Sequence, residues 1–374
     1  MAQEKKTRQA NIELLRIVAM LMIIVLHYLD KGEILVLFTR ESTAMQIVHR
    51  QIQIFCIVAV NLYVLISGYF LTESRFTIKK MVVLWAQVLF YAWGITVLFL
   101  IGGGVNIGEM GIYDWIPILM PVMGNHYWFA TIYLGLFAVS PFLNAAIRNM
   151  GKSQHKAAIA VMVTIFSLWN TFLPFTIPVS DGEGMDLPWF VCLYLIAAYI
   201  RKYPECIRIR KWMGLLIYVS AAVLSVLLGL GLLWVDSVIG KLGGYAGNFF
   251  PYNSFFTLIG SVGLFVFFLQ LKMKDGALSK CIVALGAGTF GVFLIHEHLF
   301  MRYLWPEWFG VSQMADSPWL WLHMPATVLA IFFACALIDL VRQWIFKFIF
   351  QNKIANGFFR KFEGIEKRIN GGEK

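Results

Sequence analysis

The sequence contains few charged residues: Asp, Glu, Lys and Arg together make up 14% of its 374 residues. A soluble globular domain carries about 25% charged residues, so this chain lacks the charge to cover a folded surface in water. Hydrophobic residues make up 59%, and they gather in runs long enough to cross a bilayer. The composition excludes an ordinary soluble domain and indicates an integral membrane protein.

Motifs for metal binding and for disulfide bonding are also missing. The five cysteines are scattered, with no CxxC pair, and there is no HExxH motif. His296 and His298 in the segment HEH would point about 200° apart on a helix, so they would not ligate one ion together. We therefore expect no metal. The net charge of +10 falls in short clusters between apolar runs, which argues against nucleic acid as a partner.

The apolar runs predict about ten membrane spans and hence an all-α, polytopic transmembrane helix bundle. No small-residue cleavage site follows the basic amino terminus, so the first run is predicted to be a retained span and not a signal peptide. The predicted spans cover residues 12–31, 51–71, 81–102, 128–147, 157–177, 187–200, 213–234, 253–271, 281–303 and 319–349.

Basic and acidic connecting segments alternate between these spans. Lys and Arg gather at 75–80, 148–156, 201–211, 272–280 and after Lys347, whereas 102–114 and 180–186 are acidic or neutral. Because cytoplasmic loops carry the excess of Lys and Arg, both termini are predicted to be cytoplasmic. We divide the chain into a transmembrane domain, residues 1–350, and a basic cytoplasmic tail, residues 351–374, which is expected to be a surface helix or a frayed end.

Two polar residues interrupt the first predicted span, NIELLRIVAMLMIIVLHYLDKG. Arg16 and His27 are eleven residues apart, which on an α-helix is within about 20° of three full turns and a rise of about 16.5 Å. They should share one helix face, and a cation inside a bilayer usually faces a cavity or a partner. The spacing also fits a simpler arrangement, in which Arg16 reaches the interface and pairs with Glu13 while His27 lies at headgroup level.

Motifs along nearly the whole chain resemble one family of membrane enzymes. Besides the Arg and His of the first span, they are SGYFL (67–71), HYWFATIYLGLFAVSPFL (126–143), YNSFFTLIGSVGLFVFF (252–268) and FGVFLIHEHLF (290–300). Together and in this order they resemble the membrane acyltransferase 3 family. The resemblance implies a ten-span core that moves an acyl group from coenzyme A to an acceptor, most often a hydroxyl of a cell-surface glycan.

The resemblance also implies a donor, acyl-CoA with acetyl-CoA as the default, and an acceptor, a surface glycan or lipid-linked sugar. We expect Arg16 to hold the donor by a charge-assisted contact. We expect His27 to act as general base on the acceptor hydroxyl, in preference to a role as covalent acyl carrier. Arg75, Lys79 and Lys80 follow SGYFL and are expected to bind donor phosphates, although basic residues at this place also serve as topology signals.

Depth in the membrane indicates further candidates. If the ninth span enters from the cytoplasm near Cys281, His296 lies about 22 Å along it, at a level comparable with His27. The fourth and eighth spans enter from outside, so the polar residues that open them lie at the same outer level. We expect the acceptor to be bound by His126, Asn253, Ser254, His296 and Glu297. His126 also fits an ordinary interfacial belt beside Tyr127 and Trp128.

Two other polar positions have mainly structural interpretations. Asp30, one turn beyond His27, would either fix the tautomer of that ring or simply belong to the following loop. Asp339 and Arg342, one turn apart in the last span, are predicted to form a structural pair.

Two other classes of function compete with acyl transfer. A membrane transporter or exporter of a polysaccharide or lipid-linked sugar would also need buried Arg and His, but it usually shows an internal repeat, and we find none here. A sensor or scaffold would not need Arg16 and His27 on one face. We therefore predict a multi-pass acyltransferase, with a bacterial cytoplasmic membrane as its location. The sequence specifies neither the acyl group, nor the acceptor, nor the oligomeric state.

Overall fold

The computed structural model describes residues 9–105, 108, 110–124, 126–173 and 182–371. Within these residues the chain forms helices and no strand. The helices are α1 (Ala10–Lys31), α2 (Ala44–Cys56), α3 (Val58–Leu71), α4 (Ile78–Ile101), α5 (Ile112–Leu119), α6 (Trp128–Asn149), α7 (Lys152–Val163), α8 (Trp169–Phe172), α9 (Leu187–Lys202), α10 (Lys211–Ile239), α11 (Phe255–Leu269), α12 (Ala277–His296), α13 (Met301–Trp308), α14 (Leu320–Phe350), α15 (Lys353–Arg360) and α16 (Glu363–Ile369).

Seven segments of the described chain are long and apolar enough to cross a membrane: α1, the nearly continuous α2–α3, α4, α6, α10, α12 and α14. Each coincides with a predicted span. Residues 157–173 of the predicted fifth span fall on α7 and α8, which are joined by a π-helical turn at Thr164–Leu168, and residues 174–177 lie outside the described residues. The predicted sixth and eighth fall on α9 and α11, with 16 and 15 residues. The chain is an all-helical, multi-pass membrane protein, and ten spans with cytoplasmic termini stay a prediction.

The helix of the ninth predicted span ends earlier than the predicted range 281–303. α12 ends at His296, and a separate helix, α13, begins at Met301. In a continued helix the N–H groups of Leu299 and Phe300 would donate to carbonyls four residues back. Instead, Leu299 N–H donates to His126 Nε2 (3.0 Å) and Phe300 N–H donates to His298 Nδ1 (3.3 Å). The histidine rings thus replace the helical acceptors, and the chain turns.

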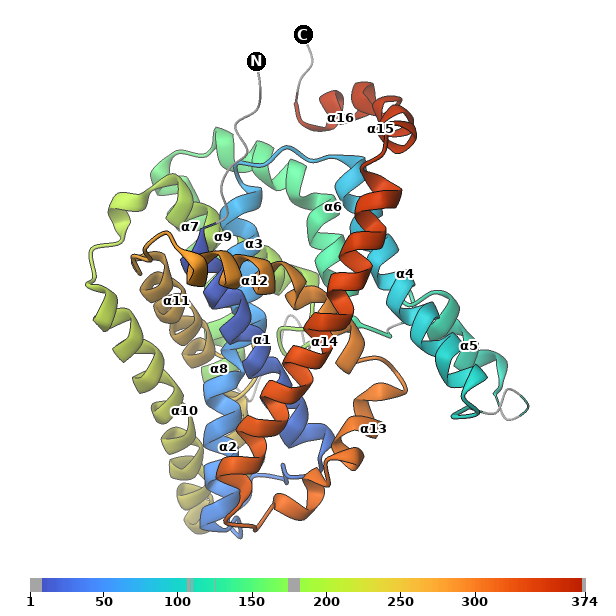
Figure 1. The fold of residues 1–374 in the computed structure, drawn as a ribbon. Helices are drawn as coiled ribbons and strands as arrows, with labels where there is room; N and C mark the ends of the chain where they lie inside the picture. The colour runs from blue at the N-terminus through green and yellow to red at the C-terminus, as the bar shows by residue number, and fades with distance from the viewer. Residues whose placement is uncertain (1–8, 106–107, 109, 125, 174–181, 372–374) are drawn as a thin grey trace.

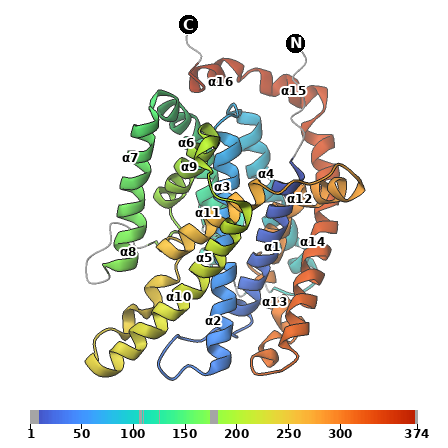
Figure 2. The same cartoon turned by 90° about the vertical axis from the view of Figure 1, so that its left-hand side faces the viewer.

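α1 lies inside the bundle, where it contacts α2, α3, α12 and α14. It begins at the end of the bundle across which α15 and α16 lie (Figures 1 and 2). We call this the tail end. The loops that follow α1 and α10 lie at the opposite end, here called the far end (Figure 2). α1 therefore runs from the tail end toward the far end, and side chains on one of its faces can lie near either end.

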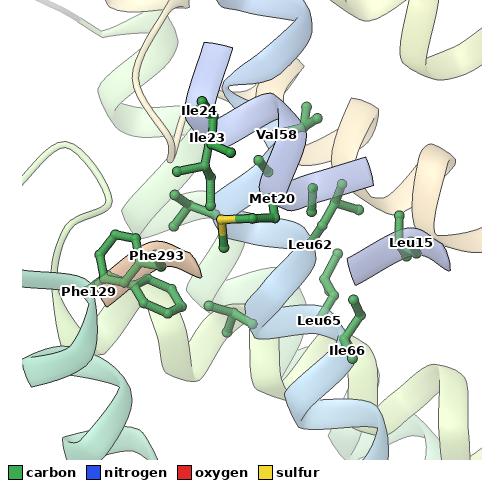
Figure 3. Packing of buried hydrophobic residues seen from close by; sticks show 14 of the residues in the cluster. Leu15, Met20, Ile23, Ile24, Val58, Leu62, Leu65, Ile66, Phe129 and Phe293 are labelled. Atoms are coloured by element: carbon green, nitrogen blue, oxygen red, sulfur yellow. The ribbon is translucent and has the colours of Figure 1, made fainter. Parts of the chain in front are cut away.

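Apolar side chains from four helices fill the centre of the bundle around α1 (Figure 3). They include Leu15, Met20, Ile23 and Ile24 of α1, Val58, Leu62, Leu65 and Ile66 of α3, Phe129 of α6 and Phe293 of α12. Tyr28 and Leu29, which follow His27, are fully buried. This packing fixes the rotation of α1, and therefore the direction in which His27 points.

The predicted structural pair of Asp339 and Arg342 is confirmed. Asp339 is fully buried, and its two oxygens accept from Arg342 (2.7–3.0 Å), from the Tyr91 hydroxyl (2.7 Å) and from Gln343 Nε2 (2.8 Å). Gly291 of α12 packs against this carboxylate, and a methyl group there would overlap it. A buried charge with several donors is stable only as a complete network, so this cluster ties α4, α12 and α14 together.

Candidate functional site

His27 of α1 and His296 of α12 are in direct contact. His27 Nδ1 lies 2.9 Å from His296 Nε2, which confirms the predicted common depth of the two rings. His296 Nδ1 lies 2.6 Å from the Val292 carbonyl oxygen. A carbonyl oxygen can only accept, so His296 carries its hydrogen on Nδ1 and its Nε2 is an acceptor. It follows that His27 donates through Nδ1–H.

This tautomer leaves the Nε2 atom of His27 with a lone pair. Within the described part of the chain, no residue forms a hydrogen bond to that nitrogen. The side chain is 18% exposed, and it lines the large cavity at the far end of the bundle. A neutral imidazole held in this way by its other nitrogen is arranged to accept a proton from a molecule in the cavity.

Glu297 brings a carboxylate to the same ring. Its Oε2 lies 3.3 Å from His27 Nδ1, and its Oε1 lies 3.5 Å from Arg302 Nε. Arg302 is held in place by two carbonyl oxygens, those of His126 (2.7 Å) and Glu297 (3.0 Å). The carboxylate near His27 is therefore Glu297, whereas Asp30 pairs with Lys31 at 2.8 Å. A proton arriving on His27 would be stabilised by Glu297.

Two neighbouring histidines use both ring nitrogens within the protein. His126 Nδ1 donates to the Pro117 carbonyl (3.0 Å), while its Nε2 accepts from Leu299 N–H. His298 Nε2 donates to the Ala92 carbonyl on α4 (3.1 Å), so this ring faces away from His296. The ring nitrogens of His126 and His298 are therefore not available to a substrate, and both rings shape the turn after α12.

No group of three or more His, Cys, Asp or Glu in the described residues is arranged to hold a metal ion.

A cavity of about 1250 Å³ begins at His27 and lies at the far end of the bundle. Small-molecule sites usually measure about 300–1,000 Å³, so this cavity has room for more than one sugar unit. His27, Glu297 and Arg302 are among the residues that line it. The loop after α1 and the loop after α10 supply nearly half of its lining residues.

Aromatic and charged side chains share the cavity walls. Trp128 and Tyr252 line it with ring centroids 5.7 Å apart. The Arg50 guanidinium lies 5.9 and 5.4 Å from the ring centroids of Phe38 and Phe250. Both carboxylates and cations line the cavity: Asp30, Lys31, Arg40, Glu41, Arg50, Glu183 and Asp236. Such a lining offers apolar ring faces beside many hydrogen-bonding groups, which suits a polyhydroxylated ligand.

The other residues predicted to bind the acceptor lie behind the cavity surface. Asn253 and Ser254 open α11 and are buried, with 3% and 1% exposure, and neither lines the cavity. His126 and His296 are also buried at 2% and 1% and touch the site through Arg302 and His27. Of the predicted acceptor residues, Glu297 is the one that the cavity reaches.

Arg16 lies in the tail-end half of α1, away from the far-end cavity, whose described lining includes His27 but not Arg16. Its Nε is 3.8 Å from a Glu13 oxygen, and its side chain is 29% exposed. The Arg16 carbonyl accepts from the Tyr63 hydroxyl of α3 at 2.8 Å. The Arg16 guanidinium and the His27 imidazole therefore belong to the same helix, but only the imidazole lines the far-end cavity.

Arg75, Lys79 and Lys80 lie at the tail end, around the start of α4. Arg75 and Lys80 are exposed. Lys79 Nζ donates to Asn356 Oδ1 (2.7 Å) in α15, and Lys80 Nζ donates to Ser74 Oγ (2.9 Å). They are separated from His27 by most of the length of the bundle, so they would contact the distant end of a long donor.

Sequence reasoning missed Arg302 as a member of the site. It lies in α13, where the pattern predicts the end of an apolar span. One signal was present: a carboxylate such as Glu297 within an apolar segment needs a cation, and Arg302 follows five residues later in EHLFMR. Trp128 is predicted to be an interfacial residue, but it lines the cavity, as does Tyr252.

A protein-family model described as an acyltransferase domain matches residues 9–341. This range contains α1 to α13, most of α14 and all the residues that line the cavity. No significant match was found among the curated proteins or among the solved structures.

Proposed function

The chain belongs to the acyltransferase 3 family, and from this premise we propose that it moves an acyl group from acyl-CoA to a hydroxyl of a glycan or lipid-linked sugar bound in the far-end cavity. Acetyl is the acyl group we propose, with acetyl-CoA as donor. The observation that carries the proposal is His27 Nε2, which has a lone pair and adjoins a cavity suited to polyhydroxylated ligands.

In the proposed reaction His27 is the general base. The acceptor oxygen attacks the carbonyl carbon of the thioester, and the hydroxyl proton passes to His27 Nε2. The carbon–sulfur bond breaks as the new ester bond forms, and the proton then passes to the departing thiolate. His296 fixes the tautomer that this step requires, and Glu297 stabilises the transient imidazolium.

The donor is proposed to reach His27 from the tail end. Arg16 and His27 differ in height by about 16.5 Å along α1, which is about half of the roughly 30 Å hydrocarbon thickness. A pantetheine arm can span such a distance while the nucleotide stays at the tail end. Arg16 would contact the arm, and Arg75, Lys79 and Lys80 would contact the phosphates. Both termini would then be cytoplasmic, in a bacterial cytoplasmic membrane.

We expect the variant R75Q/K79Q/K80Q to raise the KM for acyl-CoA with little change in kcat. Hydrogen bonds to charged groups contribute about 1.5–3 kcal/mol each, so an increase of at least about tenfold is expected. Steady-state kinetics with the purified full chain would measure it. The variant K272Q/K274Q/K280Q removes two lysines of the loop between α11 and α12 and one in the first turn of α12. It is the matched control and should keep the wild-type KM. An unchanged KM in the first variant would leave these residues as topology signals.

The proposed activity is tested directly by the transfer of label from radiolabelled acetyl-CoA to a glycan or lipid fraction in membranes that contain the purified chain. We expect label in an alkali-labile ester on the acceptor, since O-acyl esters hydrolyse in base. The same membranes without the chain are the control. Movement of the glycan across the bilayer without any ester formation would contradict the proposal and favour an exporter.

A further inference from the structure

Helices α15 and α16 form a tail that is docked on the bundle and not frayed. Asn370 makes two hydrogen bonds of 2.9 Å with the backbone of Phe76, in the loop before α4. Glu366 accepts from the Ile78 N–H at the start of α4 (2.7 Å), and Asn356 accepts from Lys79. These contacts fix one side of the tail against the bundle, so its other side has a defined direction.

That other side is apolar and exposed. Ile354 is 84% exposed, Phe358 54% and Ile365 50%. Ile354 and Phe358 are four residues apart on α15 and so share one face of it, and Ile365 lies on α16. We call these three residues the apolar stripe. Lys353, Arg360 and Lys361 are exposed beside the stripe. An apolar stripe flanked by basic residues is typical of helices that lie in the plane of a membrane interface.

The stripe continues the surface of α14 that faces lipid. Along α14 an exposed apolar row leads toward the tail with helical spacing: Leu337 (65%), Val341 (60%), Trp344 (72%) and Phe348 (77%). The tail follows two residues after α14 and lies across the tail end of the bundle (Figures 1 and 2). A chain that leaves the hydrocarbon at Phe350 and turns across the bundle end places Ile354 and Phe358 at headgroup depth.

We propose that the exposed face of α15 and α16 binds the anionic phospholipid surface of the membrane that the bundle crosses. Ile354, Phe358 and Ile365 would insert at the level of the headgroups, and Lys353, Arg360 and Lys361 would contact lipid phosphates and other anionic headgroup atoms. Because Glu366 and Asn370 join the tail to the α3–α4 loop, lipid binding would also hold this loop at the membrane surface.

The test uses the full chain in nanodiscs of phosphatidylcholine alone and in nanodiscs that also contain phosphatidylglycerol. Each basic residue near an anionic surface contributes on the order of fivefold in binding, so amide exchange in residues 353–369 should be at least about tenfold slower with phosphatidylglycerol. Equal exchange in the two lipids would overturn the proposal. In phosphatidylcholine nanodiscs, inorganic phosphate should not slow the exchange. If it slows the exchange in the wild type but not in K353Q/R360Q/K361Q, the face is a site for free anions and the lipid proposal is wrong.

Two variants separate the contributions of charge and of apolar contact. K353Q/R360Q/K361Q should lose the dependence of exchange on phosphatidylglycerol, and I354S/F358S/I365S should lose most of it. K272Q/K274Q/K280Q removes three charges around the start of α12 and should keep the dependence. Full dependence in the first variant, or its loss in the lysine control, would contradict binding through this face.

Discussion

Replacing His27 by Asn is expected to reduce kcat for acyl transfer by at least about a hundredfold, the lower end of the contribution of a general base. The Asn amide can still donate to His296 Nε2, so the contact between α1 and α12 can persist. What Asn lacks is a nitrogen lone pair that faces the cavity. Binding of the donor at the tail end should be unchanged, because Arg16, Arg75, Lys79 and Lys80 are intact.

The measurement is the rate of ester formation with His27→Asn and His27→Ala, together with the thermal unfolding of each variant. We expect both to be folded and both to be nearly inactive, whereas a histidine that only packs α1 against α12 would affect the Ala variant more than the Asn variant. Near-normal transfer by either variant would remove His27 from the proposed chemistry.

The sequence predicts the part of this site that depends on one helix. Arg16 and His27 share α1, and the helical repeat of 3.6 residues sets their relation without knowledge of any other segment. The depth of His296 follows in the same way from the rise along α12, and the 2.9 Å contact with His27 agrees with it. The apolar runs likewise predict the seven long membrane helices.

What the sequence pattern misses depends on contacts between helices. α12 ends at His296 because rings of His126 and His298 accept from the following N–H groups, and His126 comes from a segment distant in the chain. Arg302 enters the site only because of this turn. Local hydropathy cannot show that histidine rings replace backbone carbonyls as hydrogen-bond acceptors, since it does not specify the tilt or the rotation of each helix. The docking of Glu366 and Asn370 on the α3–α4 loop is hidden for the same reason.

Glu297→Gln is expected to give the second-largest loss, with kcat reduced by roughly a hundredfold, as for removal of one preorganised electrostatic group. The amide keeps the shape of the side chain, and Arg302 keeps its two carbonyl partners. The variant removes only the negative charge 3.3 Å from His27 Nδ1, which is needed when that ring becomes an imidazolium. The KM for acyl-CoA should stay within about twofold of wild type, because the carboxylate acts in the transition state and not in donor binding.

Asp30→Asn is the matched control, because Asp30 is also a carboxylate of the cavity wall but pairs with Lys31. Its loss should change kcat by less than about threefold, within the range of an exposed ion pair. Steady-state kinetics of the two variants and of wild type, at the same donor and acceptor concentrations, would separate the roles. If Asp30→Asn reduced kcat more than Glu297→Gln, Asp30 and not Glu297 would set the tautomer and charge of His27. Glu297 and Arg302 would then serve only to close the turn after α12.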